Sequence, residues 1–320
     1  MLSNGSQSEV KLFLVGANSP TGRGLIEILR KNKIRFLAPA DKNFDPVNSG
    51  SISKMIADFA PTQLVNMADF ISRNHSALKR AESSEQRCER INSLLPATLA
   101  QICNQLDIPM LHLSNSYVFD GEKKLGYNEN DETSPKGVYG YYTLAGEHAV
   151  RNHPKHIIMR SGWLFGKHKI GLIKSWIHSI KKHNGELTVT RRKFSPTATT
   201  DIASAILAVT QQVDCDANVW GTYHYSGLEI KKEIEFARQV LKYAANHDEE
   251  IYQLLDNTKI REILPRLPEL PNSTLSSKKM FDTFGIKQKS WHGNLQETIK
   301  TLYVGRLRSE LDESESDITL

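Results

Sequence analysis

The chain has 320 residues, which is enough for one large domain or two modest ones with a substantial buried core. Hydrophobic residues make up 39% and charged residues 24%, the ordinary composition of a soluble globular protein. The apolar runs are far shorter than the ~18 residues of a membrane span, and the first residues lack a signal-peptide pattern, so we expect a cytoplasmic protein. The three scattered cysteines suit free thiols in a reducing compartment.

The net charge of +5 is mild and partly local. Eight basic residues lie between positions 167 and 193, against the single acidic residue Glu186. A solvated basic face and the rim of a pocket for a phosphorylated ligand both explain this cluster. Aromatic residues do not interleave with the charges as a stacking surface would require, which argues against nucleic-acid binding.

In the first half of the chain, short apolar runs alternate with amphipathic stretches. Strands are expected in residues 10–17, 34–40, 62–68, 108–114 and 156–166. Helices are expected in residues 21–32, 51–60 and 90–107 and around Tyr139. This alternation predicts an α/β fold, a Rossmann-type doubly wound parallel sheet with helices on both faces.

After residue 166 the pattern loosens. Helices are expected in residues 171–182, 200–213, 233–246, 276–285 and 294–304, with a strand in 221–227 and a proline-punctuated loop in 263–273. We therefore expect a disordered N-terminus (1–9), a dinucleotide-binding domain (10–166), a smaller mixed α/β substrate-binding cap (167–305) and an acidic flexible tail (306–320). Some segments of the cap are expected to return to the first domain.

A glycine loop, "GANSPTG" from Gly16 to Gly22, follows the first expected strand and opens the first helix. Glycine lets the backbone approach a pyrophosphate, and the helix N-terminus offers free N–H groups with partial positive charge. Ser19 stands where a middle glycine is expected, and a tight strand–helix turn would explain the loop equally well. After the second expected strand, Asp41 and Lys42 stand together, so the sequence leaves NAD and NADP open.

Longer stretches of the sequence resemble a known family. "KLFLVGANSPTG", "RINSLLPATLA", "LHLSNSYVFDGEKKLGYNENDETSPKGVYG", "TLAGE", "MRSGWLFG" and "SPTATTDIA" are similar, in this order, to dTDP-4-dehydrorhamnose reductase and its relatives. These are extended short-chain dehydrogenase/reductases, and they include the regulatory beta subunit of methionine adenosyltransferase. The resemblance covers about residues 10–304 and implies NADP or NAD as the cofactor.

The resemblance implies a catalytic site with two substitutions. Tyr139 matches the tyrosine that gives a proton to the substrate carbonyl oxygen while the nicotinamide delivers hydride. Thr143 stands in the place of the lysine that lowers the tyrosine pKa and holds the nicotinamide ribose. Asn115 replaces the Ser/Thr that polarises the carbonyl, although its amide can still donate a hydrogen bond. Lys136 and Arg151 are the nearby cations that could replace the lysine.

The resemblance also implies binding residues for the cofactor and the substrate. The cofactor positions are Gly16, Ser19, Thr21, Gly22, Asp45 (near the adenine), Ala68 and Asp69. The substrate positions are Ser116, Trp163, Arg191 and Arg192, with the two arginines as a clamp for a diphosphate. A core tryptophan explains Trp163 equally well, and a buried ion pair is the expected role of Arg160. The spacing of histidines and cysteines predicts no metal site.

Three functions remain open from the sequence. The first is an NAD(P)H-dependent reductase of a nucleotide-linked sugar with a degenerate Tyr-x-x-x-Lys site. The second is a catalytically inactive or regulatory relative that binds NAD(P) or a nucleotide sugar and acts through a protein partner. The third uses the same pocket for another small carbonyl compound. A homodimer is also left open.

Overall fold

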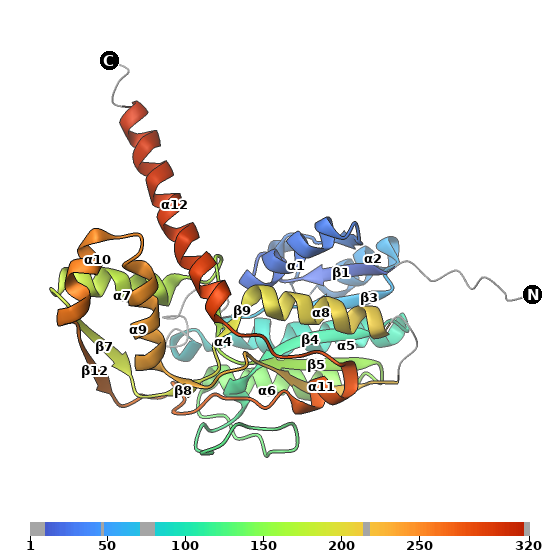
Figure 1. The fold of residues 1–320 in the computed structure, drawn as a ribbon. Coiled ribbons are helices and arrows are strands. Elements are labelled where there is room, and N and C mark those ends of the chain that lie inside the picture. Colours follow the sequence, from blue (N-terminus) through green and yellow to red (C-terminus); the bar gives the residue numbers. More distant parts are fainter. Residues whose placement is uncertain (1–9, 46–47, 71–80, 214–217, 317–320) are drawn as a thin grey trace, which may run out of the picture.

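The computed structural model describes residues 10–45, 48–70, 81–213 and 218–316. The N-terminus predicted to be disordered lies outside these ranges, as does Cys215. A six-stranded parallel sheet with the order β10-β5-β4-β3-β1-β2 forms the centre of the molecule (Figure 1). Its strands are β1 (Lys11–Val15), β2 (Arg35–Leu37), β3 (Gln63–Asn66), β4 (Met110–Asn115), β5 (His156–Ser161) and β10 (Gly221–Tyr225).

Helices cover both faces of this sheet, as predicted for a doubly wound fold. One face carries α1 (Pro20–Lys31), α8 (Thr199–Val213) and α11 (Lys278–Phe284). The other carries α2 (Ser49–Phe59), α5 (Leu95–Gln105) and α6 (Val138–Arg151), and the short α4 (Glu85–Glu89) packs beside α6. Successive residues of a strand point to opposite faces, so each buried strand contributes apolar side chains to both layers.

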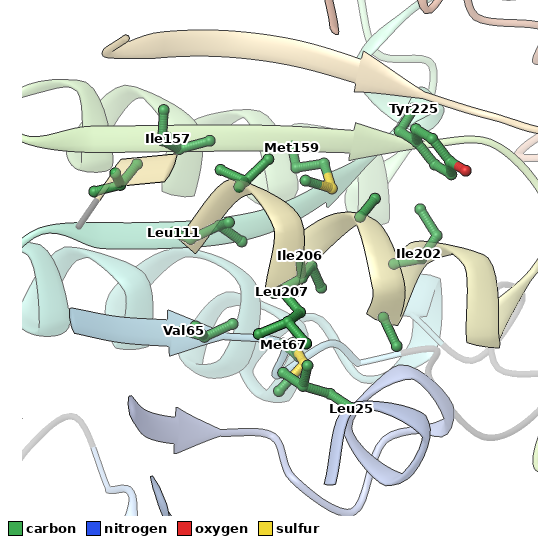
Figure 2. Packing of buried hydrophobic residues seen from close by; sticks show 14 of the residues in the cluster. Leu25, Val65, Met67, Leu111, Ile157, Met159, Ile202, Ile206, Leu207 and Tyr225 are labelled. Atoms are coloured by element: carbon green, nitrogen blue, oxygen red, sulfur yellow. The ribbon is translucent and has the colours of Figure 1, made fainter. Parts of the chain in front are cut away.

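The larger core cluster lies between the sheet and α1 and α8. Figure 2 shows Val65, Leu111 and Ile157 of the sheet packed against Ile206 and Leu207 of α8. These five side chains are all at most 8% exposed. Burial of such side chains contributes roughly 1.5–3 kcal/mol each to the free energy of folding. This packing holds the strands in place. Because the strands are parallel, their carboxyl ends meet at one edge of the sheet.

The cap forms a second cluster to one side of the sheet (Figure 1). Its elements are α7 (Gly171–Lys182), β7 (Glu186–Thr190), β8 (Lys193–Phe194), β11 (Lys231–Lys232), α9 (Glu233–Ala244), α10 (Glu249–Leu254), β12 (Lys259–Ile263) and α12 (His292–Ser316). Strands β7 and β12 pair in parallel, and β8 pairs with β11. The aromatic side chains of Trp176, Phe236 and Trp291 fill the centre of this cluster.

Several chain segments join the cap to the sheet domain, because the chain also passes from β10 to α9, from β12 to α11 and from α11 to α12. Strands β6 (Leu164–Phe165) and β9 (Thr197–Ala198) pair directly after β5 and directly before α8. The chain therefore crosses between the two parts more than once. The tail expected to be flexible overlaps the second half of α12, which extends away from the body of the molecule (Figure 1). In the described ranges, the structure has no helix that is long and apolar enough to cross a membrane.

Candidate functional site

The candidate site lies where the parallel strands end. Gly16 follows β1, Asp69 follows β3, Asn115 ends β4, and Trp163 follows β5. In open α/β sheets, ligands bind outside the carboxyl ends of the strands, where loops can present side chains without disturbing the sheet. These four residues, which were predicted for the cofactor, for catalysis and for the substrate, therefore lie at the ends of four separate strands along one edge of the sheet.

Helix α6 brings Tyr139 to this edge through two close backbone contacts. A Cβ atom on Gly140 would lie 2.2 Å from the Tyr117 carbonyl oxygen, and one on Gly146 would lie 2.1 Å from the Asn92 carbonyl oxygen. Only glycine allows a helix to approach its neighbours this closely. The glycines of "YGYYTLAGE" thus position the helix, and Tyr139 is only 1% exposed.

A buried ion pair fixes the far end of the same helix. Arg160 on β5 donates two hydrogen bonds to Glu147 on α6, at 2.8 and 2.6 Å, and Ser114 Oγ donates a third at 2.6 Å. Although burial raises the pKa of Glu147, the hydrogen bonds and charge of Arg160 more than offset this, and the pKa is lowered. The predicted structural role of Arg160 is confirmed. Arg151 also pairs with Glu147, so it does not replace the missing lysine.

The Tyr139 hydroxyl makes two hydrogen bonds. Asn115 Nδ2 donates to Tyr139 Oη at 2.6 Å, and Tyr139 Oη donates to Asp69 Oδ1 at 2.9 Å. Burial, together with the charge of Asp69 and this hydrogen bond, raises the pKa of Tyr139 well above its ordinary value. The tyrosine is therefore a weaker acid here than in water, and its proton is directed to a carboxylate.

Thr143 does not supply a charge to this tyrosine. Its hydroxyl donates to the Tyr139 carbonyl oxygen at 2.8 Å, within the helix, and accepts from Asn92 Nδ2 at 3.0 Å. Lys169, in the turn after β6, is partly buried and lies within electrostatic reach of Asp69; burial lowers its pKa, and the charge of Asp69 opposes this shift.

Asn92 is a site residue that the sequence analysis missed. It is 6% exposed, donates to both Asp69 (3.0 Å) and Thr143, and accepts from the Phe70 backbone N–H at 2.9 Å. It lies in a π-helical turn, Arg90–Leu94, and such turns are frequent at functional sites. The available signal was a lone asparagine on the buried face of "RINSLLPATLA".

The glycine loop has the geometry of a close backbone approach. Gly16 has φ of +73°, and a Cβ atom on it would lie 2.2 Å from the Ala68 backbone nitrogen. A Cβ on Gly22 would lie 2.5 Å from the Gly16 carbonyl oxygen. Ser19 caps α1, with its Oγ accepting from the Gly22 N–H at 3.0 Å, and Thr21 is buried in the first turn.

Ser19 therefore occupies the Gly22 N–H group, which could otherwise donate a hydrogen bond to a phosphate. Pro20, the first residue of α1, has no N–H, so the helix N-terminus offers fewer donors than a glycine-rich loop. Further along this edge, Asn18 Nδ2 lies 3.4 Å from Asp41 Oδ2. Asp45, predicted near the adenine, pairs with Arg90 at 2.6 Å, with both side chains about half exposed.

The residues predicted for the substrate lie on the cap side. Trp163 packs on Phe194 with ring centroids 4.8 Å apart, at the border of the cap cluster. Ser116 is buried in a 3₁₀ turn, Ser116–Val118, directly after Asn115. Arg192 is buried and paired with Glu233, whereas Arg191 is exposed with its Nε 3.9 Å from a Glu262 oxygen.

The sequence is similar to known proteins over most of its length. The family described as the RmlD substrate binding domain matches residues 10–304. The chain belongs to this family. A dTDP-4-dehydrorhamnose reductase of Sinorhizobium fredii is 27% identical over 304 residues, covering 92% of this chain and 98% of that protein. The resemblance noted in the sequence is thereby confirmed.

Solved structures show the same fold across this family. A dTDP-4-dehydrorhamnose reductase of Clostridium acetobutylicum has a TM-score of 0.78 and 26% identity, covering 92% of this chain and 99% of its own. A dTDP-4-dehydrorhamnose reductase of Bacillus anthracis, in complex with NADP, has a TM-score of 0.75 and 23% identity, covering 91% and 97% of the two chains. The Rossmann-type α/β fold predicted from the sequence is confirmed.

Proposed function

We propose that this protein is an NAD(P)H-dependent reductase of a nucleotide-linked keto sugar, with a proton donor that Asp69 restrains. The observation that carries the proposal is the position of the Tyr139 hydroxyl, between the amide of Asn115 and the carboxylate of Asp69 at the carboxyl edge of the sheet. The relatives are dTDP-4-dehydrorhamnose reductases, which supports a nucleotide sugar as the substrate.

The residues around the glycine loop fit a nicotinamide dinucleotide. Gly16 and Gly22 leave no room for a Cβ, and Ala68 lies directly against the loop, as a close backbone cradle requires. The bound cofactor would supply hydride to the sugar carbonyl carbon. Gly16, Thr21 and Gly22 would hold its pyrophosphate at the start of α1, and Asp45 would lie toward the adenine. A carboxylate such as Asp41 favours a free ribose hydroxyl and a lysine such as Lys42 favours a 2′-phosphate, so the pair leaves the choice between NAD and NADP open.

Proton transfer to the substrate oxygen is the difficult step at this site. Tyr139 must give its proton to the substrate oxygen and become a phenolate while it faces Asp69. Asn115 stabilises that phenolate through its amide N–H. A neutral amide stabilises a phenolate less than the positive charge of a lysine at position 143 would. Loss of a well-placed cation typically lowers proton transfer by about 10²–10⁴-fold. We therefore expect slow turnover.

Two observations favour a second candidate, a regulatory relative that binds ligands without turnover. The Tyr139 proton is directed to Asp69, and Ser19 withdraws a phosphate donor, so the site is altered on both its catalytic and its cofactor side. Fold alone does not determine turnover, so a relative can keep this fold without catalysis. Such a protein would act through a protein partner.

Calorimetric titration of NADPH and NADH, followed by turnover of dTDP-4-dehydrorhamnose, tests both candidates. The reductase is supported if one cofactor binds and slow oxidation of it is abolished in Tyr139→Phe with binding retained. Binding without any turnover, in the wild type and in Asp69→Asn alike, would favour the regulatory candidate. If neither cofactor binds, the reductase proposal is wrong.

A further inference from the structure

The turn that follows β6, residues 166–169, is fixed by contacts at both of its ends. The Lys169 backbone N–H donates to the Gly166 carbonyl oxygen at 2.8 Å. Gly166 has φ of +152°, and a Cβ atom on it would lie 2.4 Å from Thr199 Oγ1 at the start of α8. After the turn, Ile170 packs against the cap cluster, and α7 begins at Gly171. These contacts define the backbone path of the turn.

The basic side chains of this turn have different surroundings. Lys167 Nζ lies 2.6 Å from Glu27 Oε2, and His168 Nε2 lies 3.3 Å from Glu27 Oε1, so both side chains are bound to α1. Lys169 is partly buried, and its ammonium group forms no hydrogen bond or salt bridge with the residues that the structure describes. A buried charge without a partner is costly, so the surroundings of this ammonium group matter.

Asp69 is held by the same unit of the sheet domain as the turn. A Cβ atom on Gly16, at the end of β1, would lie 2.2 Å from the backbone nitrogen of Ala68, the residue before Asp69. Glu27, which binds the outer side chains of the turn, lies on α1 directly after this loop. The β1–α1 unit therefore holds Asp69 and the turn together, and the charge of Asp69 acts on Lys169.

The hydrogen-bonded group around Tyr139 contains a negative charge and no positive one. Its members are Tyr139, Asn115, Asp69, Asn92 and Thr143, of which Asp69 carries the charge. A carboxylate beside the tyrosine opposes formation of the phenolate, and a cation near that carboxylate offsets its effect.

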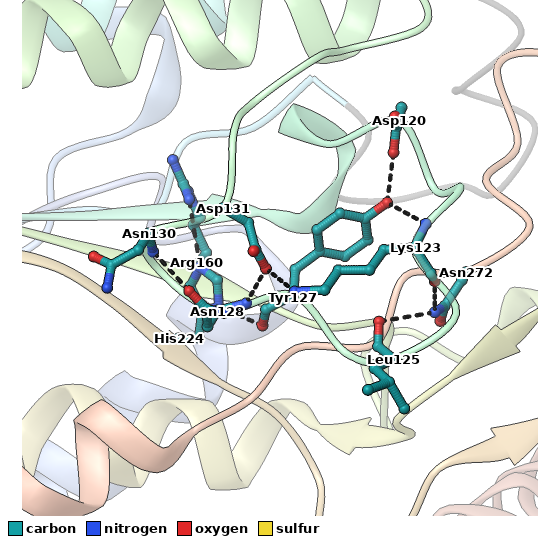
Figure 3. Close-up of polar contacts among 10 residues, drawn as sticks. All are labelled: Asp120, Lys123, Leu125, Tyr127, Asn128, Asn130, Asp131, Arg160, His224 and Asn272. Carbon is teal, nitrogen blue, oxygen red and sulfur yellow. Dashed lines mark hydrogen bonds and ion pairs between the residues drawn. The ribbon is translucent and has the colours of Figure 1, made fainter.

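The two cations that the sequence analysis named have other carboxylate partners. Arg151 pairs with Glu147 on its own helix at 2.7 Å. Lys136 is exposed, and its charge acts on Asp120, which accepts a hydrogen bond from the Tyr127 hydroxyl at 2.6 Å (Figure 3). Lys169 is thus better placed than either of them to act on Asp69.

We propose that Lys169 is the cation of this site: its ammonium group offsets the Asp69 carboxylate and thereby favours the Tyr139 phenolate during proton transfer. Lys169 acts through Asp69 and does not touch the reacting atoms. Because lysine carries a compact charge on a flexible stem, the charge can come from a different backbone position than residue 143. This inference rests on the proposed function, since it assigns a role in the proton step of that reaction.

NMR of methylated lysines tests the coupling of Lys169 to Asp69 without any turnover. Reductive ¹³C-methylation labels the lysines of the full-length protein, and Lys169→Arg identifies the Lys169 resonance by its loss. We expect the pKa of Lys169 to be lower in Asp69→Asn than in the wild type, because the carboxylate favours the charged ammonium group. Asp58→Asn, on the exposed surface of α2, is the matched control and should leave the Lys169 titration unchanged.

Turnover variants separate the charge of Lys169 from its packing. Lys169→Gln should lower kcat for NADPH oxidation roughly 3–10-fold, since solvent screens a charge that is only partly buried. Lys169→Arg keeps the charge and should retain most of the activity. In the Asp69→Asn background, Lys169→Gln should change kcat by less than about twofold, because no carboxylate is left to offset. Lys174→Gln, on the exposed face of α7, is the matched control and should leave kcat unchanged.

Several outcomes would overturn the proposal. They are an unchanged Lys169 titration in Asp69→Asn, an equal loss of kcat on Lys169→Gln in both backgrounds, and a loss in Lys169→Arg as large as in Lys169→Gln. A higher KM for NADPH with unchanged kcat in Lys169→Gln would also overturn it, because Lys169 would then only bind the cofactor. Thermal unfolding confirms that each variant is folded. Coupling in the NMR titration without turnover would refute the reductase proposal alone, and turnover without coupling would refute this one alone.

Discussion

The substitution Asp69→Asn tests whether the carboxylate restrains the proton donor. Asparagine has the same shape, and its side-chain oxygen can still accept hydrogen bonds from Tyr139 and Asn92. The change therefore removes a charge and leaves the geometry unchanged. At an effective dielectric constant of ~20, two unit charges 2.9 Å apart repel by about 6 kcal/mol. If the phenolate is half formed in the transition state, about 3 kcal/mol of this repulsion opposes the reaction.

An energy of about 3 kcal/mol corresponds to a rate factor of ~10². Asp69 is only partly buried, so solvent screening lowers the expectation to a roughly 10–100-fold increase in kcat for Asp69→Asn. The assay is oxidation of NADPH with dTDP-4-dehydrorhamnose, and Asp58→Asn on the exposed surface of α2 is the matched control. An unchanged or lower kcat in Asp69→Asn, with cofactor affinity preserved, would refute the inference that Asp69 slows proton transfer from Tyr139.

Three further predictions concern the lysine position, the glycine loop and acid stability. Thr143→Lys should lower the pKa of Tyr139, seen as phenolate absorbance at lower pH than in the wild type, and cost about 1–3 kcal/mol of stability through overpacking; an unchanged titration would contradict this. Ser19→Gly should tighten NADPH binding by freeing the Gly22 N–H, at a cost of only a few tenths of a kcal/mol; calorimetry showing equal or weaker binding would count against the role given to Ser19. Burial lowers the pKa of His112 to about 4 and of His224 to about 3, below the ~6.5 of an unfolded histidine, so their stabilising contribution is present above pH ~6.5 and declines below it. Denaturation at pH ~5.5 should show a loss of about 1.4 kcal/mol per histidine relative to the plateau above pH ~6.5, and a flat profile would contradict it.

The sequence alone determined the architecture and supplied candidate residues for the site. Short apolar runs and amphipathic stretches are local patterns, so they predicted the six sheet strands and the helices between them. The strand pair β7 and β12 was missed, because β12 alternates exposed and partly buried residues and lacks a continuous apolar run. Tyr139, Thr143 and Asn115 were found because they lie in the short motifs that carry the family resemblance.

Only the tertiary structure decided how these residues act. The acceptor of the Tyr139 proton lies 70 residues away in the chain, and Asn92 joins Asp69 to Thr143 across 23 and 51 residues. Arg192 and Glu233 are 41 residues apart. A local pattern states which face of an element is buried, but not which side chain from another element it meets. Packing at the carboxyl edge of the sheet and within the cap decides those partners, and with them the strength of Tyr139 as an acid.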